Sequence, residues 1–123
     1  MRRPKAVDLF AGAGGMSLGF EQAGYDIVAA VEIDPIHAAT HKFNFPECAI
    51  FPKSVSDVSG NEFLRAADLC VGDFDLVFGG VPCQGLSLIG QRAMDDPSTR
   101  LVKHCVRLVA ELGATYFVFE NFK

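Results

Sequence analysis

The sequence predicts an α/β fold built on a parallel sheet, and three observations carry that prediction. Short β-branched or aromatic runs alternate along the chain with segments of helical pattern, which is typical of parallel strands joined by crossover helices. The run at 26–31 is nearly continuous in apolar residues, as expected of a strand covered on both faces. Glycines, acids and a cysteine follow the expected strands directly, at the sheet edge where such folds bind ligands.

The elements can be placed in chain order. We expect strands at residues 6–10, 26–31, 49–51, 75–78 and 114–119. We expect helices at residues 16–23, 35–43, 61–69 and 97–112. Gly24 provides the stop of the first helix, and Asp34 followed by Pro35 provides the N-cap and first turn of the second. Apart from its short strand, the stretch 44–59 is expected to be a polar loop.

Composition limits the class of protein. The chain has 123 residues, of which 50% are hydrophobic and 21% charged, so it has the size and core content of one globular domain. It has no apolar run that could span a membrane and no signal peptide, so we expect a cytoplasmic protein. The four cysteines form no CxxC pair, and we expect no metal. A net charge of −4 argues against this chain gripping a phosphate backbone by itself.

A glycine-rich turn at 11–15 follows the first expected strand. Its glycines allow close approach of a ligand, and its amides lie where a helix begins and can meet an anionic group. Glu32, 20 residues after Gly12, is placed to accept hydrogen bonds from the two hydroxyls of a ribose. A tight turn and a solvated carboxylate are the structural alternatives, but the two features together favour a nucleoside site. Ser17 stands where a strict dinucleotide motif has its third glycine.

Cys83 lies just after the fourth expected strand, behind Gly-Gly-Val-Pro. Burial is the commonest state for such a cysteine. Glu120, however, ends the neighbouring strand and offers a carboxyl group as proton donor, and the polar segment 85–96 has the composition of a lid. A thiol and a carboxyl at adjacent strand ends, beside a nucleoside site, favour a nucleophile over a buried structural cysteine.

Four blocks of the sequence, in this order and spacing, resemble the motifs of the cytosine-C5 DNA methyltransferases. They are Asp8–Gly15, Val31–Asp34, Gly79–Ser87 and Glu120–Asn121. The similarity spans essentially the whole chain and corresponds to the N-terminal half of the family's catalytic domain. It implies a Rossmann-like methyltransferase fold with strand order 3-2-1-4-5, helices on both faces, and S-adenosylmethionine as cofactor.

The resemblance also assigns cofactor contacts. Phe10 would stack on the adenine, Glu32 would take the ribose hydroxyls, and Leu101 would line the pocket. The amides of the turn would meet the methionine part of the cofactor, which involves Ala11, Gly12, Ala13, Gly14 and Gly15. The remaining implied pocket residues are Ile33, Ser54, Val55 and Pro82. The family usually has an acid where Ser54 aligns, and an alternative register gives the adenine contact to Asp57; both remain open.

For catalysis, the resemblance implies that Cys83 adds to C6 of a cytosine flipped out of the duplex, which makes C5 electron-rich. Glu120, protonated, would bond N3, and Asn121 would support the strand end. The expected nucleic-acid contacts are Gln84, Ser87 and Arg92.

The resemblance also implies parts that these 123 residues do not contain. The target recognition domain and the C-terminal part of the family's catalytic domain lie outside residues 1–123, which we expect to form one cofactor-binding and catalytic subdomain. The apolar strand at 116–119 would then be an unpaired edge that invites another chain. We expect a truncation or one polypeptide of a split enzyme, with DNA and a complementary polypeptide as partners and no activity alone.

Two other classes of function remain open. A non-catalytic nucleoside-binding scaffold would need neither Cys83 nor Glu120, and a tRNA cytosine-C5 methyltransferase would share both. A nicotinamide-dependent dehydrogenase is weakened by Ser17 and by a cysteine that hydride transfer does not need.

Overall fold

The structure, a computed structural model, describes residues 2–82 and 97–121. Within these residues it contains one sheet of five strands in the order β3-β2-β1-β4-β5, and every neighbouring pair is parallel. The α/β class and the strand order 3-2-1-4-5 are therefore confirmed. The strands are β1 (Lys5–Asp8), β2 (Asp26–Val31), β3 (Ala49–Phe51), β4 (Leu76–Gly80) and β5 (Tyr116–Glu120). The helices are α1 (Gly15–Gln22), α2 (Pro35–Asn44), the 3-10 helix η1 (Val55–Asp57), α3 (Gly60–Ala67) and α5 (Pro97–Leu112).

Local chemistry explains where the element bounds differ from the expected ones. β1 ends at Asp8 rather than Phe10, because the Phe10 amide turns back to the Asp8 carboxylate. β5 begins at Tyr116 rather than Ala114, because Gly113 has φ 63° and the Ala114 amide still donates to α5 at Val109 O. The expected loop 44–59 contains η1, which Ser54 caps through the Ser56 amide.

Two helix boundaries follow the expected signals. Asp34 is the N-cap of α2, where its carboxylate accepts from the amides of Ile36 and His37 and Pro35 occupies the first turn. Gly24, with φ 107°, follows the C-cap of α1 and lets the chain turn into β2. A capping box between Ser59 and Glu62 starts α3 one residue earlier than expected.

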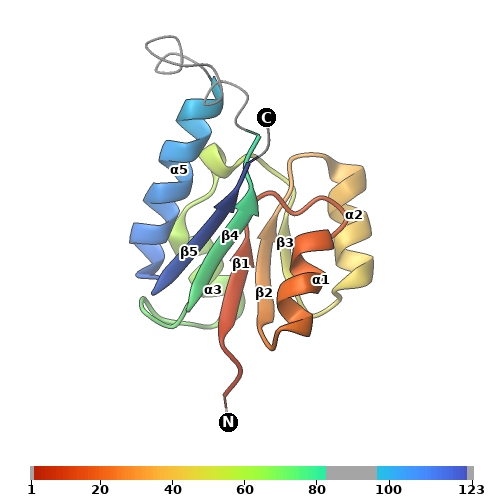
Figure 1. Ribbon diagram of the computed structural model, residues 1–123, viewed down its shortest axis with the longest axis vertical. Coiled ribbons are helices and arrows are strands. Elements are labelled where there is room, and N and C mark those ends of the chain that lie inside the picture. Colours follow the sequence, from red (N-terminus) through yellow and green to blue (C-terminus); the bar gives the residue numbers. More distant parts are fainter. Residues whose placement is uncertain (1, 83–96, 122–123) are drawn as a thin grey trace.

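Helices cover both faces of the sheet, as expected (Figure 1). On one face, residues of β1, β2 and β4 such as Ala6, Ala30 and Phe78 pack with side chains of α1. On the other face, alternating residues of the same strands pack against α3 and α5. Alternation along each strand therefore supplies two apolar layers, which is why these strands are buried on both sides.

β5 forms one edge of the sheet (Figure 1). It pairs with β4, and the described residues include no strand on its other side. Tyr116, Phe117 and Val118 are exposed. Apolar side chains on an edge strand of this kind are suited to contact with further polypeptide.

Parallel pairing brings the ends of β1, β2, β4 and β5 to the same edge of the sheet (Figure 1). This carboxyl edge is where ligands bind in open α/β sheets. None of the helices in the described residues has the length and hydropathy that crossing a bilayer requires. The same residues contain no group of three metal-ligating side chains.

Candidate cofactor and active site

A cavity of about 130 Å³ opens at the carboxyl edge of the sheet. Its walls come from the ends of β1 and β2, the segment that leads into η1, the end of β4 and the first turns of α5. Seven of the residues that the sequence assigned to cofactor binding line it, and they are Phe10, Glu32, Ile33, Ser54, Val55, Pro82 and Leu101. These residues come from separate segments of the chain, and the fold brings them around one space.

Glu32 is held from two sides. One carboxylate oxygen accepts from the Gly12 amide at 2.9 Å, and the other accepts from the Asp34 amide at 2.8 Å. Each oxygen keeps a further lone pair for a ligand. The carboxylate is therefore fixed in place in the lining of the cavity before any ligand arrives.

Phe10 has its position because β4 carries a glycine opposite it. A Cβ built on Gly79 would lie 3.1 Å from Phe10 Cδ2, so a larger residue would displace the aromatic ring. Sequence reasoning treated Gly79 only as part of the block around Cys83 and missed this packing. The strand register, which pairs β1 with β4, is the information that was lacking.

None of the turn residues Ala11–Gly15, which the sequence also assigned to cofactor binding, lines this cavity. The Ala11 amide donates to Val31 O, and Gly12 contacts Glu32, so both tie the turn to β2. Gly12 and Gly14 have φ of 54° and 111°, which favours glycine at both positions.

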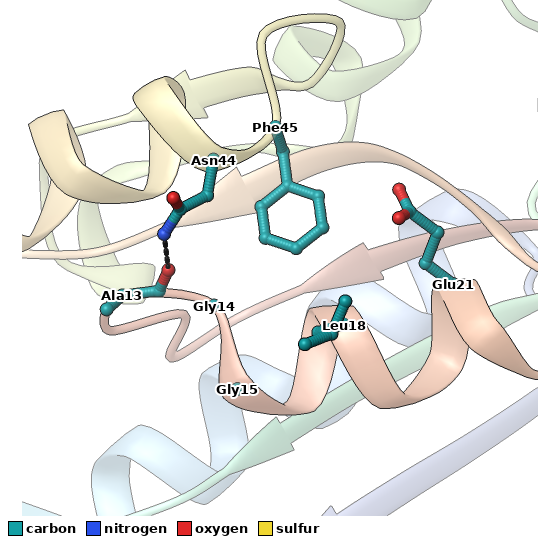
Figure 2. Close-up of a pocket in the computed structure, with 7 residues that line it drawn as sticks. All are labelled: Ala13, Gly14, Gly15, Leu18, Glu21, Asn44 and Phe45. Atoms are coloured by element: carbon teal, nitrogen blue, oxygen red, sulfur yellow. Dashed lines mark hydrogen bonds between the residues drawn. The ribbon is translucent and has the colours of Figure 1, made fainter.

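Three residues of the turn line a different space. Ala13, Gly14 and Gly15 border a groove of about 430 Å³ between α1 and α2, which shares no lining residue with the cavity. Figure 2 shows the Phe45 ring, Leu18 and Glu21 around this groove, with the Asn44 amide donating to Ala13 O at 3.0 Å.

The proposed acid lies close to the end of β4. Glu120 is the last residue of β5, is exposed, and pairs in register with Gly80, while the Val81 amide donates to Glu120 O at 2.9 Å. A Cβ on Gly80 would lie 3.2 Å from a carboxylate oxygen of Glu120. The glycine therefore leaves room for that carboxylate. Asn121 follows it and is exposed.

Part of the predicted site lies outside the described residues. It consists of Cys83, Gln84, Ser87 and Arg92. Cys83 comes three residues after Gly80, the partner of Glu120 in the sheet.

The two residues predicted as alternatives for the adenine contact, Ser54 and Asp57, lie at the two ends of η1. Ser54 lines the cavity, whereas Asp57 is not among the lining residues. The Ser54 hydroxyl oxygen already accepts from the Ser56 amide at 3.2 Å and from the Ser56 hydroxyl at 2.8 Å.

Arg107 of α5 anchors η1 and was not found from the sequence. Its guanidinium donates to Val55 O at 3.0 Å and to Val58 O at 2.9 Å. Glu111 bonds the same guanidinium and also accepts from the Gly60 amide, and these interactions lower the pKa of the Glu111 carboxyl. An arginine on an amphipathic helix gives no sequence signal of such a contact.

Beneath the glycine turn lies a buried polar group that sequence reasoning also missed. Asp8, Ser17 and His41 are each 0% exposed. The Ser17 hydroxyl lies 2.7 Å from Asp8 Oδ2 and 3.0 Å from His41 Nε2. Burial raises the pKa of Asp8 to about 6 and lowers the pKa of His41. The departure of Ser17 from the dinucleotide motif was the available signal.

A family model for the C-5 cytosine-specific DNA methylases matches residues 4–123. The chain belongs to this family. The resemblance drawn from the four sequence blocks is therefore confirmed, and the family takes its methyl group from S-adenosylmethionine. The roles of individual residues remain predictions.

Relatives within the family include two curated methyltransferases of type II. The chain is 64% identical over its whole length to Type II methyltransferase M.XorII of Xanthomonas oryzae pv. oryzae, and covers 29% of that protein. It is 41% identical over 97% of its length to Type II methyltransferase M.AquIA of Picosynechococcus sp., and covers 48% of it. The chain thus spans less than half the length of these relatives.

A solved structure shares the fold. The crystal structure of a putative DNA modification methyltransferase encoded within an E. coli prophage superimposes with a TM-score of 0.79 at 38% identity, over 96% of this chain and 32% of that one. The cavity described above therefore lies in a fold that this chain shares with that protein.

Proposed function

We propose that residues 1–123 form the cofactor-binding and catalytic subdomain of a DNA cytosine-C5 methyltransferase of the restriction-modification kind. The observation that carries this proposal is the cavity at the carboxyl edge. Predicted cofactor residues from separate segments line it, and the Gly80–Glu120 pair lies at the same edge of the sheet.

The residues around the cavity fit S-adenosylmethionine. Phe10, Pro82 and Leu101 give it apolar walls suited to the face of a purine, and the fixed carboxylate of Glu32 suits the two hydroxyls of a ribose. The cofactor supplies an electrophilic methyl group on a sulfonium. Ser54 or Asp57 would contact the adenine amino group, and the lining of the cavity favours Ser54.

The catalytic proposal concerns Cys83 and Glu120. The Cys83 thiolate forms a bond to C6 of cytosine, and the electron pair of the C5–C6 double bond moves to C5 and N3. Glu120, in its protonated form, donates to N3 and stabilises the added charge. After C5 is methylated, a base removes the C5 proton, the S–C6 bond breaks and the thiolate leaves. Asn121 supports the strand end that carries Glu120.

DNA binding is proposed to need further polypeptide. The chain has a net charge of −4, which disfavours phosphate contacts, and its relatives are more than twice as long. A target recognition region, in the rest of a longer protein or in a complementary chain, would bind the exposed edge of β5 and flip the cytosine. Without it, we expect no methyl transfer.

The decisive experiment traps the covalent step. The chain, alone and together with the C-terminal part of a relative, is incubated with S-adenosylmethionine and duplex DNA that contains 5-fluorocytosine. Fluorine at C5 prevents the final elimination, so the proposal predicts a covalent complex for the combined proteins and none for Cys83→Ser. RNA containing the same base tests the tRNA alternative. Absence of any adduct would favour the scaffold.

A further inference from the structure

Three buried polar side chains connect three elements beneath the glycine turn. Asp8 ends β1, Ser17 lies in the first turn of α1, and His41 lies near the end of α2. All three are 0% exposed, and the Ser17 hydroxyl is within hydrogen-bond distance of both Asp8 and His41. The proposed cofactor contacts and the proposed chemistry use none of the three.

The direction of each hydrogen bond in this network follows from the donors and acceptors that each group has. The second Asp8 oxygen accepts from the Phe10 amide at 3.3 Å, so an ionised Asp8 accepts on both oxygens. Ser17 has one hydroxyl proton, and it then points to Asp8. His41 Nε2 must therefore carry a proton and donate to Ser17. The donors run in one direction, from His41 to Ser17 to Asp8.

The other nitrogen of His41 supports this order. Nδ1 is buried and has no hydrogen-bond partner within the described residues. With the proton on Nε2, Nδ1 of a neutral ring is a bare acceptor. If the hydrogen bonds ran the other way, from Asp8 to Ser17 to His41, Nδ1 of the neutral ring would carry the proton. That buried N–H would have no acceptor, which is less favourable than a buried acceptor without a donor. The structure thus favours an ionised Asp8 and a neutral His41.

The network closes the loop that holds the glycine turn. Asp8 and Ser17 flank residues 9–16, so their 2.7 Å hydrogen bond ties the two ends of that segment together. His41 also packs against the turn at Gly14. A Cβ on Gly14 would lie 3.2 Å from His41 Cδ2 and would overlap the Phe45 ring. The rings of His41 and Phe45 are stacked, with their centroids 4.8 Å apart.

We propose that Asp8, Ser17 and His41 are positioning residues, which hold Phe10 and the glycine turn in the shape that receives the cofactor and release that shape when Asp8 takes up a proton. The proposal rests on the proposed function for its ligand. It predicts that cofactor affinity falls as the pH falls through the range in which Asp8 titrates.

The groups that act on Asp8 make it the titrating member of the network. Glu32, after β2, raises the pKa of Asp8 further, although burial is the main cause of its value of about 6. His41, on α2, has a lowered pKa through burial and stays neutral. Cys48, before β3, is near enough to Asp8 to interact with it electrostatically, but burial raises the pKa of its thiol to about 12, so it is uncharged. From β4, Phe78 contributes an apolar side chain.

Nuclear magnetic resonance of the full chain, labelled with ¹⁵N, tests the network without any ligand. At pH 8 we expect His41 protonated on Nε2 and not on Nδ1. We expect the amides of Phe10 and of residues 11–15 to titrate together with a midpoint near pH 6, and this titration to vanish in Asp8→Asn. Protonation of His41 on Nδ1, or an unchanged titration in Asp8→Asn, would overturn the proposal.

Cofactor binding tests the positioning role. We expect Ser17→Ala to weaken S-adenosylmethionine binding roughly 10-fold or more and to abolish its pH dependence between 5 and 8. Ser59→Ala is the matched control, because it removes the cap of α3 and loses stability far from the turn. Equal affinity for Ser17→Ala and the unsubstituted chain would overturn the inference. No binding by the unsubstituted chain would instead contradict the proposed function, while the resonance experiment still decides the network.

Discussion

The Glu32 carboxylate accepts a hydrogen bond from the Gly12 amide at 2.9 Å, which fastens the end of β2 to the glycine turn that follows β1. Its second oxygen accepts from the Asp34 amide, directly before α2. One side chain thereby fixes two of the segments that carry predicted cofactor residues. Its own orientation is set by the backbone, so a ligand would meet a carboxylate already in place.

Glu32→Gln is predicted to damage both binding and stability. An amide nitrogen in place of one oxygen would face the Gly12 or the Asp34 N–H, so a donor would lose its acceptor. We expect the unfolding free energy to fall by about 1–3 kcal/mol and cofactor affinity to fall at least 10-fold. Urea unfolding and equilibrium dialysis measure the two effects. Glu47→Gln, at an exposed position, is the control, and equal losses in both variants would contradict the role of Glu32.

Asp8 is predicted to make stability depend on pH in an unusual direction. Its pKa is about 6 in the fold against 3.8 ordinarily, so the native state binds the proton more tightly than the unfolded chain. Ionisation of Asp8 therefore lowers the free energy of unfolding by about 3 kcal/mol above pH 6. This loss disappears as the pH falls through 6 towards 3.8.

The comparison with Asp8→Asn isolates this effect. We expect the unsubstituted chain to gain stability relative to Asp8→Asn as the pH is lowered from 7 to 4, measured by urea unfolding. Parallel stability curves for the two proteins would show that Asp8 does not titrate in this range. The carboxylate thus reduces stability at neutral pH while it orders the turn, a trade found at functional sites.

Arg107→Ala is predicted to loosen the η1 side of the cavity. The variant leaves Val55 O and Val58 O without these donors and removes one of the two partners of Glu111, which keeps the Gly60 amide. We expect a loss of about 1–3 kcal/mol in unfolding free energy and weaker cofactor binding. Arg65→Ala, on the exposed side of α3, is expected to change neither. If Arg107→Ala binds the cofactor as tightly as the parent, η1 does not contribute to the site.

Gly79→Ala is predicted to act through the Phe10 ring. The new methyl group would lie 3.1 Å from Phe10 Cδ2, so the ring, which lines the cavity, must shift by a few tenths of an ångström. We expect cofactor affinity to fall with a modest loss of stability. Gly19→Ala is the matched control, because no atom lies within 4 Å of its Cβ and alanine favours the helix by about 0.5–1 kcal/mol. Unchanged affinity in Gly79→Ala would remove Phe10 from the site.

Within the described residues, local patterns sufficed for the strands and the α-helices, though not for η1, and for the edge of the sheet that carries the site. Asp34-Pro35 and Gly24 signal helix ends through chemistry that acts within a few residues, and strand ends in a parallel sheet share one edge. Contacts between distant segments could not be predicted. The space that Gly79 leaves for Phe10 depends on strand register, and the bond of Arg107 to η1 depends on how α5 packs.

The buried network of Asp8, Ser17 and His41 also depends on contacts between distant segments, so it could not be predicted from the sequence. Asp8 and Ser17 were visible, one within the first block and one as a departure from a glycine motif. His41 lies 24 residues from Ser17 and gives no pattern that links it to them. Only the packing of α2 beside α1 makes the three side chains neighbours.

Amide chemical-shift mapping of the ¹⁵N-labelled chain during titration with S-adenosylmethionine tests the central claim, that the cavity at the carboxyl edge is the cofactor site. The account predicts the largest shifts at Ile33, Val55 and Leu101, which line the cavity. It predicts small shifts at Leu18, Asn44 and Phe45, which line the separate groove. Shifts centred on that groove, or no shifts at millimolar cofactor, would contradict it.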